Sequence, residues 1–395
     1  MMRPRNPIQP PERCAVVVRR RPGAPPLRGA GPRLLTFALL AILAPLGFAG
    51  CAEPTIPGEW TVELAETLTV GASPESYETA FYMPAAIGFD FKNRMFVLDS
   101  GNHRIQIFGP DGQFERSLGS YGAAPGNLAA PMGMWVYPDG SLIVADARNR
   151  RLQPYGAAGA PLDTIALDFA PLDVVGTKDR LFVLRLAQAS MIMGPDERAL
   201  VQVLDRSGAP LDAFVDAAEA QAGILYLLRN TFCMASGPAG GIALSDTHFN
   251  SRIRLFSPAG ALQREIPVLY KAGAWAPLGR QPATLNDATL ETIAKTASDL
   301  AWDPLRRVYW LLAGYSDRDP DGEWVIGQEL YRYDVDGTYR GSAMLPIRGT
   351  VLAVAPDGKI WIADLDGVLH GFVVRDPDME SLIPAPEAPA STTGR

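Results

Sequence analysis

The feature that most constrains this chain is a repeated phrase. The segment VLDSGNHRIQIFGPDGQF at 97–114 returns as VADARNRRLQPYGAAGAPL at 144–162 and as LSDTHFNSRIRLFSPAGAL at 244–262. Each copy runs from an apolar stretch through a polar loop into a second apolar stretch and a turn. Self-similarity of this kind means that equivalent supersecondary units pack against one another, so the fold has to be a repeat architecture.

Within and between these copies the chain predicts short β-strands. Runs of apolar and β-branched residues such as MFVLDS, LIVADA and IWIADL are bounded by Gly, Pro, Asp or Asn, which is typical of strands. Asp-Gly pairs between such runs favour tight hairpin turns. They recur at 111–112, 139–140, 321–322, 336–337, 357–358 and 366–367. Helical periodicity is scarce, and the best helix candidate is NDATLETIAKTASDL at 286–300.

The strands fall into six units. Five units predict four strands each, whereas the sixth has three and runs into a Pro-rich tail at 377–395. A spare strand, WTVELAETLTVG at 60–71, precedes the first unit. If it pairs with the sixth unit, it closes a ring and hides strand edges that an open array would expose. We therefore predict an all-β fold, a six-bladed β-propeller of four-stranded antiparallel blades over residues 60–376, closed by its N-terminal strand.

The first 50 residues predict an export signal. Eight Arg and one acid, Glu12, precede the apolar run LLTFALLAILAPLGFAG at 34–50. A basic start, an apolar core and a small-residue exit are typical of a secretory signal. Because Cys51 follows, the segment resembles a bacterial lipoprotein signal, which implies lipidation of Cys51 and a linker over 51–59. An uncleaved membrane anchor is the alternative, since an apolar run of 17 residues is at the lower limit for spanning a bilayer.

The same segment sets the compartment and the class of partner. A lipoprotein signal implies a chain anchored by lipid to a membrane facing the periplasm, the outer membrane included, or displayed at the cell surface. Without residues 1–50 the chain keeps 28 basic and 42 acidic residues. Such a surface repels phosphate backbones, so we expect no nucleic-acid partner. The single cysteine of the folded part, Cys233, is expected to be a small core residue, and the protein is expected to be a monomer.

The first two units resemble a known repeat. DSGNHRIQIFGPDGQF and the following SLGSYGAAPGNLAAPMGMWVYPDGSLIVADARNRRLQ are similar to NHL repeats, which join an Asn-His-Arg-Ile loop, a Phe-Gly-Pro-Asp-Gly turn, a Gly-rich connector and a Pro-x-Gly entry. The other units match this pattern less well. The resemblance implies a six-bladed propeller. It implies no single activity, because the repeat is found in binding modules and in enzymes.

Loop lengths differ between the two faces of such a disc. Turns between first and second strands, and between third and fourth, are short, as in YPDG, GPDG, DVDG and APDG. Loops between second and third strands and between units meet on the other face, and they are long at 186–199, 272–296 and 314–328. We call this the long-loop face. Long loops on a rigid scaffold usually carry binding, so we expect this face to recognise a protein, peptide or glycan at the mouth of the central channel.

Charged residues recur at strand ends on the long-loop face. The candidate binding residues are Asp99, Arg104, Asp146, Arg185, Asp246, Arg252 and Asp364. As a ring of charge they could hold a ligand. As architecture, each Asp would tie down its own loop or pair with a neighbouring Arg, and repetition at one position favours this alternative. Arg185 stands where other units carry Asp, and it could bind an anion or pair with a neighbouring Asp.

One acidic loop raises the question of calcium. DRDPDG at 317–322 fits the start of a calcium-binding loop that turns at Gly. Asp317, Asp319 and Asp321 would be the ligands. A solvated acidic turn is the alternative. The sequence suggests no cofactor other than this calcium, and it requires none.

The three histidines are the candidate ligands for a zinc ion. His103, His248 and His370 fall at differing positions of their units, whereas zinc needs ligands that converge on one point. Zinc-dependent propeller lyases of the amidating type and calcium-dependent lactonase-type propellers resemble this architecture. The competing function is therefore a metal-dependent lyase or lactonase-type hydrolase with its site at the channel mouth. The sequence predicts no catalytic residue.

Overall fold

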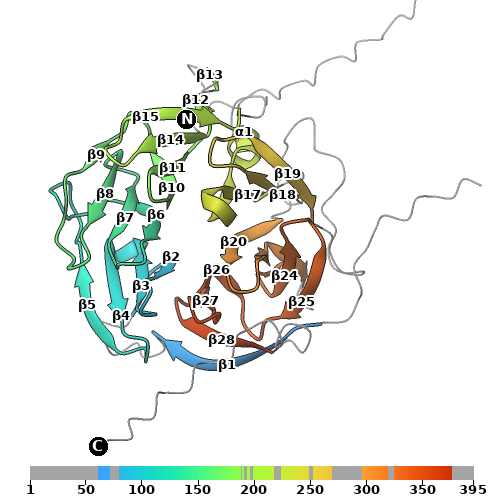
Figure 1. The fold of residues 1–395 in the computed structure, drawn as a ribbon. Coiled ribbons are helices and arrows are strands. Elements are labelled where there is room, and N and C mark those ends of the chain that lie inside the picture. The colour runs from blue at the N-terminus through green and yellow to red at the C-terminus, as the bar shows by residue number, and fades with distance from the viewer. Residues whose placement is uncertain are drawn as a thin grey trace, which may run out of the picture. The chain divides into compact units, whose positions relative to one another are not determined.

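The computed structural model describes residues 61–71, 80–187, 189–190, 194–195, 199–217, 224–248, 252–268, 296–318 and 324–375. These residues form six four-stranded antiparallel sheets set around a central axis (Figure 1). Each sheet is a blade of a β-propeller, so the predicted fold class is confirmed. The predicted signal at 1–50, Cys51, the linker at 51–59 and the tail at 377–395 lie outside the described residues.

The blades follow one another in chain order, each from its inner to its outer edge. The first blade is β2 (Pro84–Phe89), β3 (Met95–Asp99), β4 (Arg104–Phe108) and β5 (Phe114–Leu118), and the second is β6 (Pro131–Val136), β7 (Leu142–Asp146), β8 (Arg151–Tyr155) and β9 (Ile165–Ala166). The third blade is β10 (Pro171–Gly176), β11 (Arg180–Arg185), β14 (Val201–Asp205) and β15 (Pro210–Phe214), and the fourth is β16 (Phe232–Ser236), β17 (Ile242–Asp246), β18 (Arg252–Phe256) and β19 (Leu262–Pro267). The fifth blade is β20 (Ala297–Asp303), β21 (Val308–Ala313), β24 (Glu329–Asp334) and β25 (Tyr339–Met344), and the sixth is β26 (Gly349–Val354), β27 (Ile360–Asp364), β28 (Leu369–Arg375) and β1 (Glu63–Val70).

The burial of a strand depends on its place in the blade. The second strands β3 and β21 are buried at every position, because a neighbouring blade covers each face. Strands covered on both faces are continuous apolar runs, which explains MFVLD and VYWLLA. The outer strand β5, FERSL, instead alternates between half-buried and exposed residues. The pattern of apolar and polar residues therefore indicates whether a strand lies inside its blade or at the outer edge.

The hydrophobic core lies between blades. Phe96 and Leu98 of the first blade pack in one cluster with Met134 and Val144 of the second. Equivalent clusters join the other neighbouring blades. Each blade is thus stabilised mainly by its neighbours, so the fold is most stable when the ring is complete. Among the described residues, no helix has the length and apolar character to cross a membrane.

The N-terminal strand completes the last blade, as predicted. β1 pairs antiparallel with β28 from Glu63 opposite Arg375 to Val70 opposite Leu369, with one register shift. Figure 1 shows β1 beside β28 at the outer edge of the sixth blade. Ahead of the strand, the N–H of Val62 donates to the carbonyl of Ser342 in the fifth blade at 3.0 Å.

Side chains also hold the closing strand in place. Val62 is buried in the cluster between the fifth and sixth blades, and Val70 in the cluster between the sixth and first. His370 Nδ1 lies 2.7 Å from Glu66 on β1, and its Nε2 lies 3.1 Å from Asp364 on β27. The closing strand therefore contacts three consecutive blades.

The predicted helix at 286–300 is wrong at its C-terminal end. Residues 297–300 belong to β20, while residues 286–295 lie outside the described residues. Leu300 and Ala301 are buried between blades, and this packing outweighs the local helical pattern. A short helix that the sequence did not predict, α1 (Ile224–Arg229), precedes the fourth blade. Two small hairpins also lie in the long loops, β12 (Ala189–Ser190) with β13 (Gly194–Pro195) and β22 (Tyr315–Arg318) with β23 (Trp324–Ile326).

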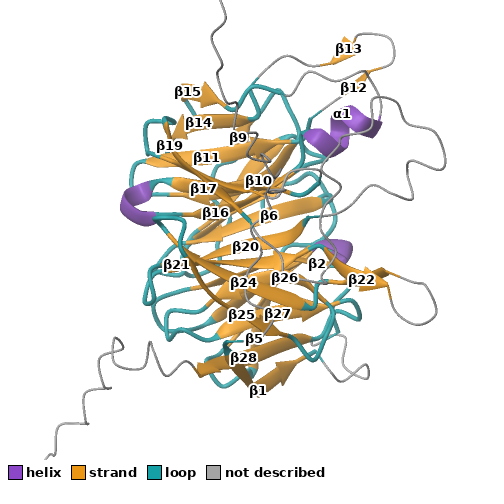
Figure 2. Cartoon of the chain, turned by 90° about the vertical axis from the view of Figure 1, so that its right-hand side faces the viewer, coloured by secondary structure: helices purple, strands orange, loops and turns teal. Residues whose placement is uncertain are grey.

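The extra elements share one face of the disc. α1 lies in a connector between blades, and β22 in a loop between second and third strands. Figure 2 shows α1, β12 and β22 projecting on the same side of the blades. This is the long-loop face. The opposite face carries short turns, which include the three-residue helix η2 (Pro238–Gly240) between β16 and β17.

Candidate binding site in the central channel

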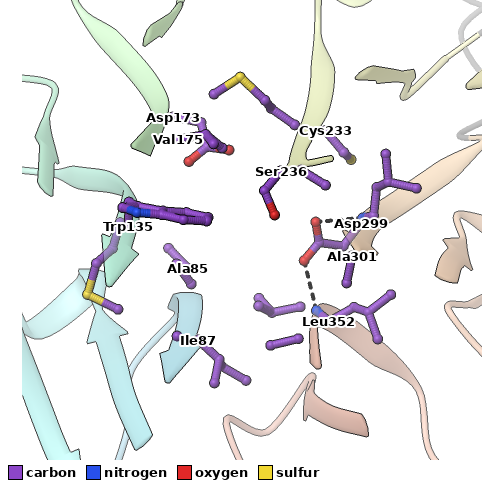
Figure 3. A pocket seen from close by; sticks show the side chains of 18 of the residues that line it. Ala85, Ile87, Trp135, Asp173, Val175, Cys233, Ser236, Asp299, Ala301 and Leu352 are labelled. Carbon is purple, nitrogen blue, oxygen red and sulfur yellow. Dashed lines mark hydrogen bonds between the residues drawn. The ribbon is translucent and has the colours of Figure 1, made fainter. Parts of the chain in front are cut away.

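The inner strands of the six blades surround a channel. Its cavity volume is about 570 Å³, and β2, β6, β10, β16, β20 and β26 all line it. A volume of this size suits a small molecule or one group of a larger ligand. Every blade contributes residues to the channel lining (Figure 3).

One ring of channel residues differs between its two halves. The ring takes one residue from each inner strand, namely the residue that pairs with the second-to-last residue of the neighbouring second strand. Around the six blades it reads Ala86, Gly133, Asp173, Cys233, Asp299 and Val351. Three consecutive blades therefore present Asp, Cys and Asp, whereas the other three present Ala, Gly and Val. We call the first half the acidic half of the channel.

A bulge precedes this ring in five blades. The register shifts between Pro171 and Asp173 and between Ala297 and Asp299, and at the matching places in β2, β6 and β26. β16 pairs without a shift. A bulge turns the following side chain out of the regular alternation, so it sets how the two Asp side chains enter the channel.

Asp299 joins two blades. Its Oδ1 accepts a hydrogen bond from the N–H of Leu300 at 2.8 Å. Its Oδ2 accepts one from the N–H of Leu352 on β26, also at 2.8 Å (Figure 3). The inner edge of β26 has no further strand beside it, and an unpaired buried N–H is costly. Asp299 therefore stabilises the ring as well as giving the channel a negative charge.

Asp173 is held less tightly. Its Oδ1 accepts a hydrogen bond from the N–H of Val174 at 2.8 Å. The side chain packs against Gly133 of the second blade, where a Cβ atom would lie 2.2 Å from Oδ1. Burial raises the pKa of the Asp173 carboxyl to about 8, the Val174 N–H opposes the shift, and the negative charge of Asp299 adds to it. The raised pKa favours the protonated form of this carboxyl near neutral pH.

Trp135 brings an aromatic ring to the same space. Figure 3 shows its indole directed toward the middle of the channel beside Asp173. Tyr137 packs edge-on against it with centroids 6.3 Å apart. Gly176 makes room for both rings, since a Cβ there would lie 2.7 Å from Trp135 Cδ1 and 2.1 Å from the Tyr137 hydroxyl.

Two polar groups in the channel wall have hydrogen-bonding capacity to spare. Trp135 Nε1 and Ser298 Oγ are buried and have no hydrogen-bond partner among the described residues. The thiol of Cys233, in contrast, donates to the carbonyl of Ser298 at 3.3 Å. His248 lines the wall near one end, with Nδ1 2.8 Å from the Thr247 hydroxyl. Buried polar groups are usually satisfied, so Trp135 Nε1 and Ser298 Oγ are exceptions among the described residues.

The predicted charged ring lies on the second and third strands of the blades, behind the inner strands that line the channel. Asp99 and Asp146 are fully buried and pair with Arg104 and Arg151 of their own blades, each at 2.8 Å. Asp99 Oδ1 also accepts the Tyr82 N–H at 2.8 Å. Asp146 Oδ1 accepts the Ala129 N–H at 2.7 Å. Each Asp thus clamps the connector that leads into its blade, which is the architectural alternative.

The remaining members follow the same pattern less strictly. Asp246 pairs with Arg252 at 2.8 Å. Asp364 accepts the N–H groups of Asp366 and Val368 and lies beside His370. Arg185 is 1 % exposed and stands opposite Pro171 in the third blade. The structure does not gather these residues into one site, and a role in ligand binding stays a prediction.

The residues considered for metals lie apart. His103 is on the first blade, where its ring contacts Tyr121 with centroids 5.0 Å apart, His248 follows β17, and His370 is on β28. Asp319 and Asp321 lie outside the described residues, and of Asp317 only its place in β22 is described. Within the described part of the chain, no three His, Cys, Asp or Glu side chains are grouped so as to hold an ion.

Large apolar side chains are exposed on the long-loop face. Six of them, each at least 41 % exposed, lie where an inner strand begins, just after a second strand ends, or, for Tyr121, in the connector between β5 and β6: Tyr82, Met83, Tyr121, Met132, Leu186 and Leu365. We call them the apolar rim. Scattered exposed apolar residues are ordinary, whereas a group on one face marks an interaction site.

Sequence reasoning missed Asp173, Asp299 and Trp135. The predicted first strands LDVVG, SDLAWD and GMWVY contain all three. Aligning these first strands, rather than the more regular second strands, would have shown two Asp at one position. What the alignment could not show is that the bulges turn them toward a common channel.

Comparisons with known proteins agree on the fold. Residues 89–237 match the DUF5128 family model, which is described as a 6-bladed beta-propeller. None of the curated proteins matches the chain. A member of the DUF4221 family from Bacteroides vulgatus is similar in structure, with a TM-score of 0.55 and 12 % identity, over 80 % of this chain and 99 % of that one.

Two further solved structures are similar. A Bacteroides fragilis protein described as exported has a TM-score of 0.50 and 12 % identity, over 80 % of this chain and 95 % of its own. Virginiamycin B lyase from Staphylococcus aureus has a TM-score of 0.45 and 11 % identity, over 79 % and 99 %. At these identities a likeness shows the fold alone. The family model and the structure together show that the chain is an all-β, six-bladed propeller.

Proposed function

We propose that this chain is an exported, lipid-anchored recognition protein, facing the periplasm or the cell surface, that binds a protein, peptide or glycan on its long-loop face. The signal-like segment at 34–50 and Cys51 support the export and the anchor, and the resemblance to NHL repeats fits a binding scaffold. The observation that carries the binding proposal is the apolar rim, the exposed apolar side chains on the long-loop face. A ligand that covers the rim can insert one group into the channel.

The rim can be tested against a matched position on the other face. Tyr82 lies on the rim and Phe91 lies in the β2–β3 turn of the opposite face, and both are 62 % exposed. A phage-displayed peptide library and a glycan array are screened with the unaltered protein, and the binders are then measured against Tyr82→Ser with Tyr121→Ser, and against Phe91→Ser. We expect the rim variant to weaken the binders at least tenfold and the Phe91 variant to change them less than twofold.

Two results would count against the proposal. One is that neither the library nor the array yields a binder. The other is that Phe91→Ser weakens the binders as much as the rim variant does. Circular dichroism of both variants checks that they stay folded, which is expected because exposed side chains contribute little to stability.

A metal-dependent lyase or lactonase-type hydrolase remains the second proposal. It is favoured by a different feature, the two carboxyls that the acidic half brings into one channel. Elemental analysis of the dialysed protein separates the two proposals. One zinc or calcium ion per chain that survives dialysis favours the enzyme. If dialysis removes the metal and binding to the apolar rim is unchanged, the result favours recognition.

A further inference from the structure

We propose that the channel binds a small primary or secondary amine on an apolar or aromatic body, with the ammonium group between Asp173 and Asp299 and the body against Trp135. The inference rests on the proposed recognition function, because the channel opens on the long-loop face that carries the apolar rim. It adds the chemistry of the group that the channel accepts. Peptide side chains, free amines and amino sugars share this chemistry.

The charge of the lining favours a cation. Among the described residues that line the channel there is neither Lys nor Arg, while Asp173 and Asp299 are both present. The whole chain also carries a formal net charge of −7. A low-dielectric cavity with charges of one sign attracts ions of the opposite sign and repels those of the same sign. A carboxylate or phosphate ligand would meet no compensating charge here.

The carboxyl geometry leaves acceptors for N–H donors. Asp173 Oδ1 accepts one hydrogen bond, from Val174, and Oδ2 accepts none from any described residue. Asp299 accepts backbone N–H groups with both oxygens, and its contribution to the site is its negative charge. Figure 3 shows both carboxyls entering the same space from different blades. An ammonium group has two or three donors and can contact both.

The apolar part of such a ligand also has a surface to contact. Ala85, Ile87, Val175 and Ala301 supply methyl groups around the channel, and Trp135 supplies an aromatic face (Figure 3). Indole is the side chain that attracts cations best through its face, so Trp135 can contact either the ammonium group or the ring that carries it. The cavity volume of about 570 Å³ accommodates an amine with one aromatic ring.

Proton release should accompany binding. Burial raises the pKa of the Asp173 carboxyl to about 8, and a cation beside it favours the ionised form. Below pH 8 the cation must displace this proton, so affinity should rise as the pH rises through 8. The other titratable groups that face the channel are Asp299 on β20, Cys233 on β16 and His248 after β17. Phenethylamine is a suitable probe, because an alkylamine stays protonated up to about pH 10.

The test compares phenethylamine with two matched molecules. We expect calorimetry at pH 8.5 to show phenethylamine binding at least tenfold more tightly than 2-phenylethanol, its uncharged analogue, and no binding of phenylacetate. Affinity for the amine should rise several-fold from pH 6.5 to 8.5. Asp173→Asn should weaken amine binding at least tenfold and remove the pH dependence, while the surface control Asp357→Asn should change neither.

A second variant protects the test against misfolding. Trp135→Phe keeps an aromatic ring in the wall and should weaken the amine several-fold without changing the pH dependence. Equal affinities for amine and alcohol, or unchanged amine binding in Asp173→Asn, would overturn the inference. If the amine does not bind while the library binders still depend on Tyr82 and Tyr121, the channel site is wrong and the recognition proposal is kept. If the amine binds while no binder depends on the rim, the channel site stands without the rim.

Discussion

A chain that begins at residue 72 is expected to lose the cooperative fold that a chain beginning at residue 53 retains. The missing segment contains β1, which makes the whole outer edge of the sixth blade. Its loss removes a ladder of backbone hydrogen bonds and uncovers Phe372 and Val374, which are buried. It also removes the contacts of Val62 and Val70 with the fifth and first blades.

The expected cost of this deletion is larger than any single substitution. Each of the buried apolar side chains contributes about 2 kcal/mol, and a lost ladder of strand pairing adds to that. The total is comparable with the roughly 5–15 kcal/mol that stabilises a typical domain. We therefore expect loss of the unfolding transition in urea, and aggregation through the exposed edge of β28.

A complementation experiment provides the control. A synthetic peptide of residues 60–71, added to the shorter chain during refolding, should restore the transition if strand pairing is what was lost. The same peptide with Pro in place of Ala65, which lies opposite Val373, should not, because Pro cannot donate to the ladder. An unfolding transition in the shorter chain equal to that of the longer one would show that β1 does not close the ring.

Replacing Asp146 by Ala should cost about 3–5 kcal/mol of unfolding free energy, the range seen when one partner of a buried ion pair is removed. The Asp146 carboxylate is fully buried and accepts hydrogen bonds from Ala129, Asn149 and Arg151. Without it, the guanidinium of Arg151, which is 8 % exposed, keeps its charge in the interior. The connector before β6 also loses the bond that holds it.

An exposed Asp in a short turn is the matched control. Asp357 pairs with Lys359 at 3.0 Å, but both side chains are about one-third exposed, so Asp357→Ala should cost less than about 1 kcal/mol. Urea unfolding of the two variants gives the comparison. Similar small losses for both would contradict the clamp role of Asp146. A loss of binding without a loss of stability would instead favour the charged ring as a ligand site.

The sequence predicted the fold well because each level of pattern agreed with the others. Apolar runs marked second strands such as β3 and β21, Asp-Gly pairs marked the short turns, and the unpaired segment at 60–71 matched the missing strand of the sixth unit. The helix predicted up to residue 300 is wrong at its end, because burial between blades favours the strand there: Leu300 is 3 % exposed.

The candidate site was predicted only in its location. The long-loop face and the channel mouth followed from loop lengths, but the residues chosen there, such as Asp99 and Asp146, are paired within their own blades. Asp173 and Asp299 are far apart in the chain and share a site only because the ring is closed and the inner strands are bulged. Neither condition can be seen in a local stretch of sequence.

The proposed amine site depends most on the state of one carboxyl in the channel. A carbon-NMR titration of the Asp side-chain carboxyls, compared between the unaltered protein and Asp173→Asn, measures that state directly. We predict one carboxyl that titrates near pH 8 in the unaltered protein and is missing in the variant. An Asp173 carboxyl that titrates near pH 4, as in an exposed Asp, would contradict the proposed site.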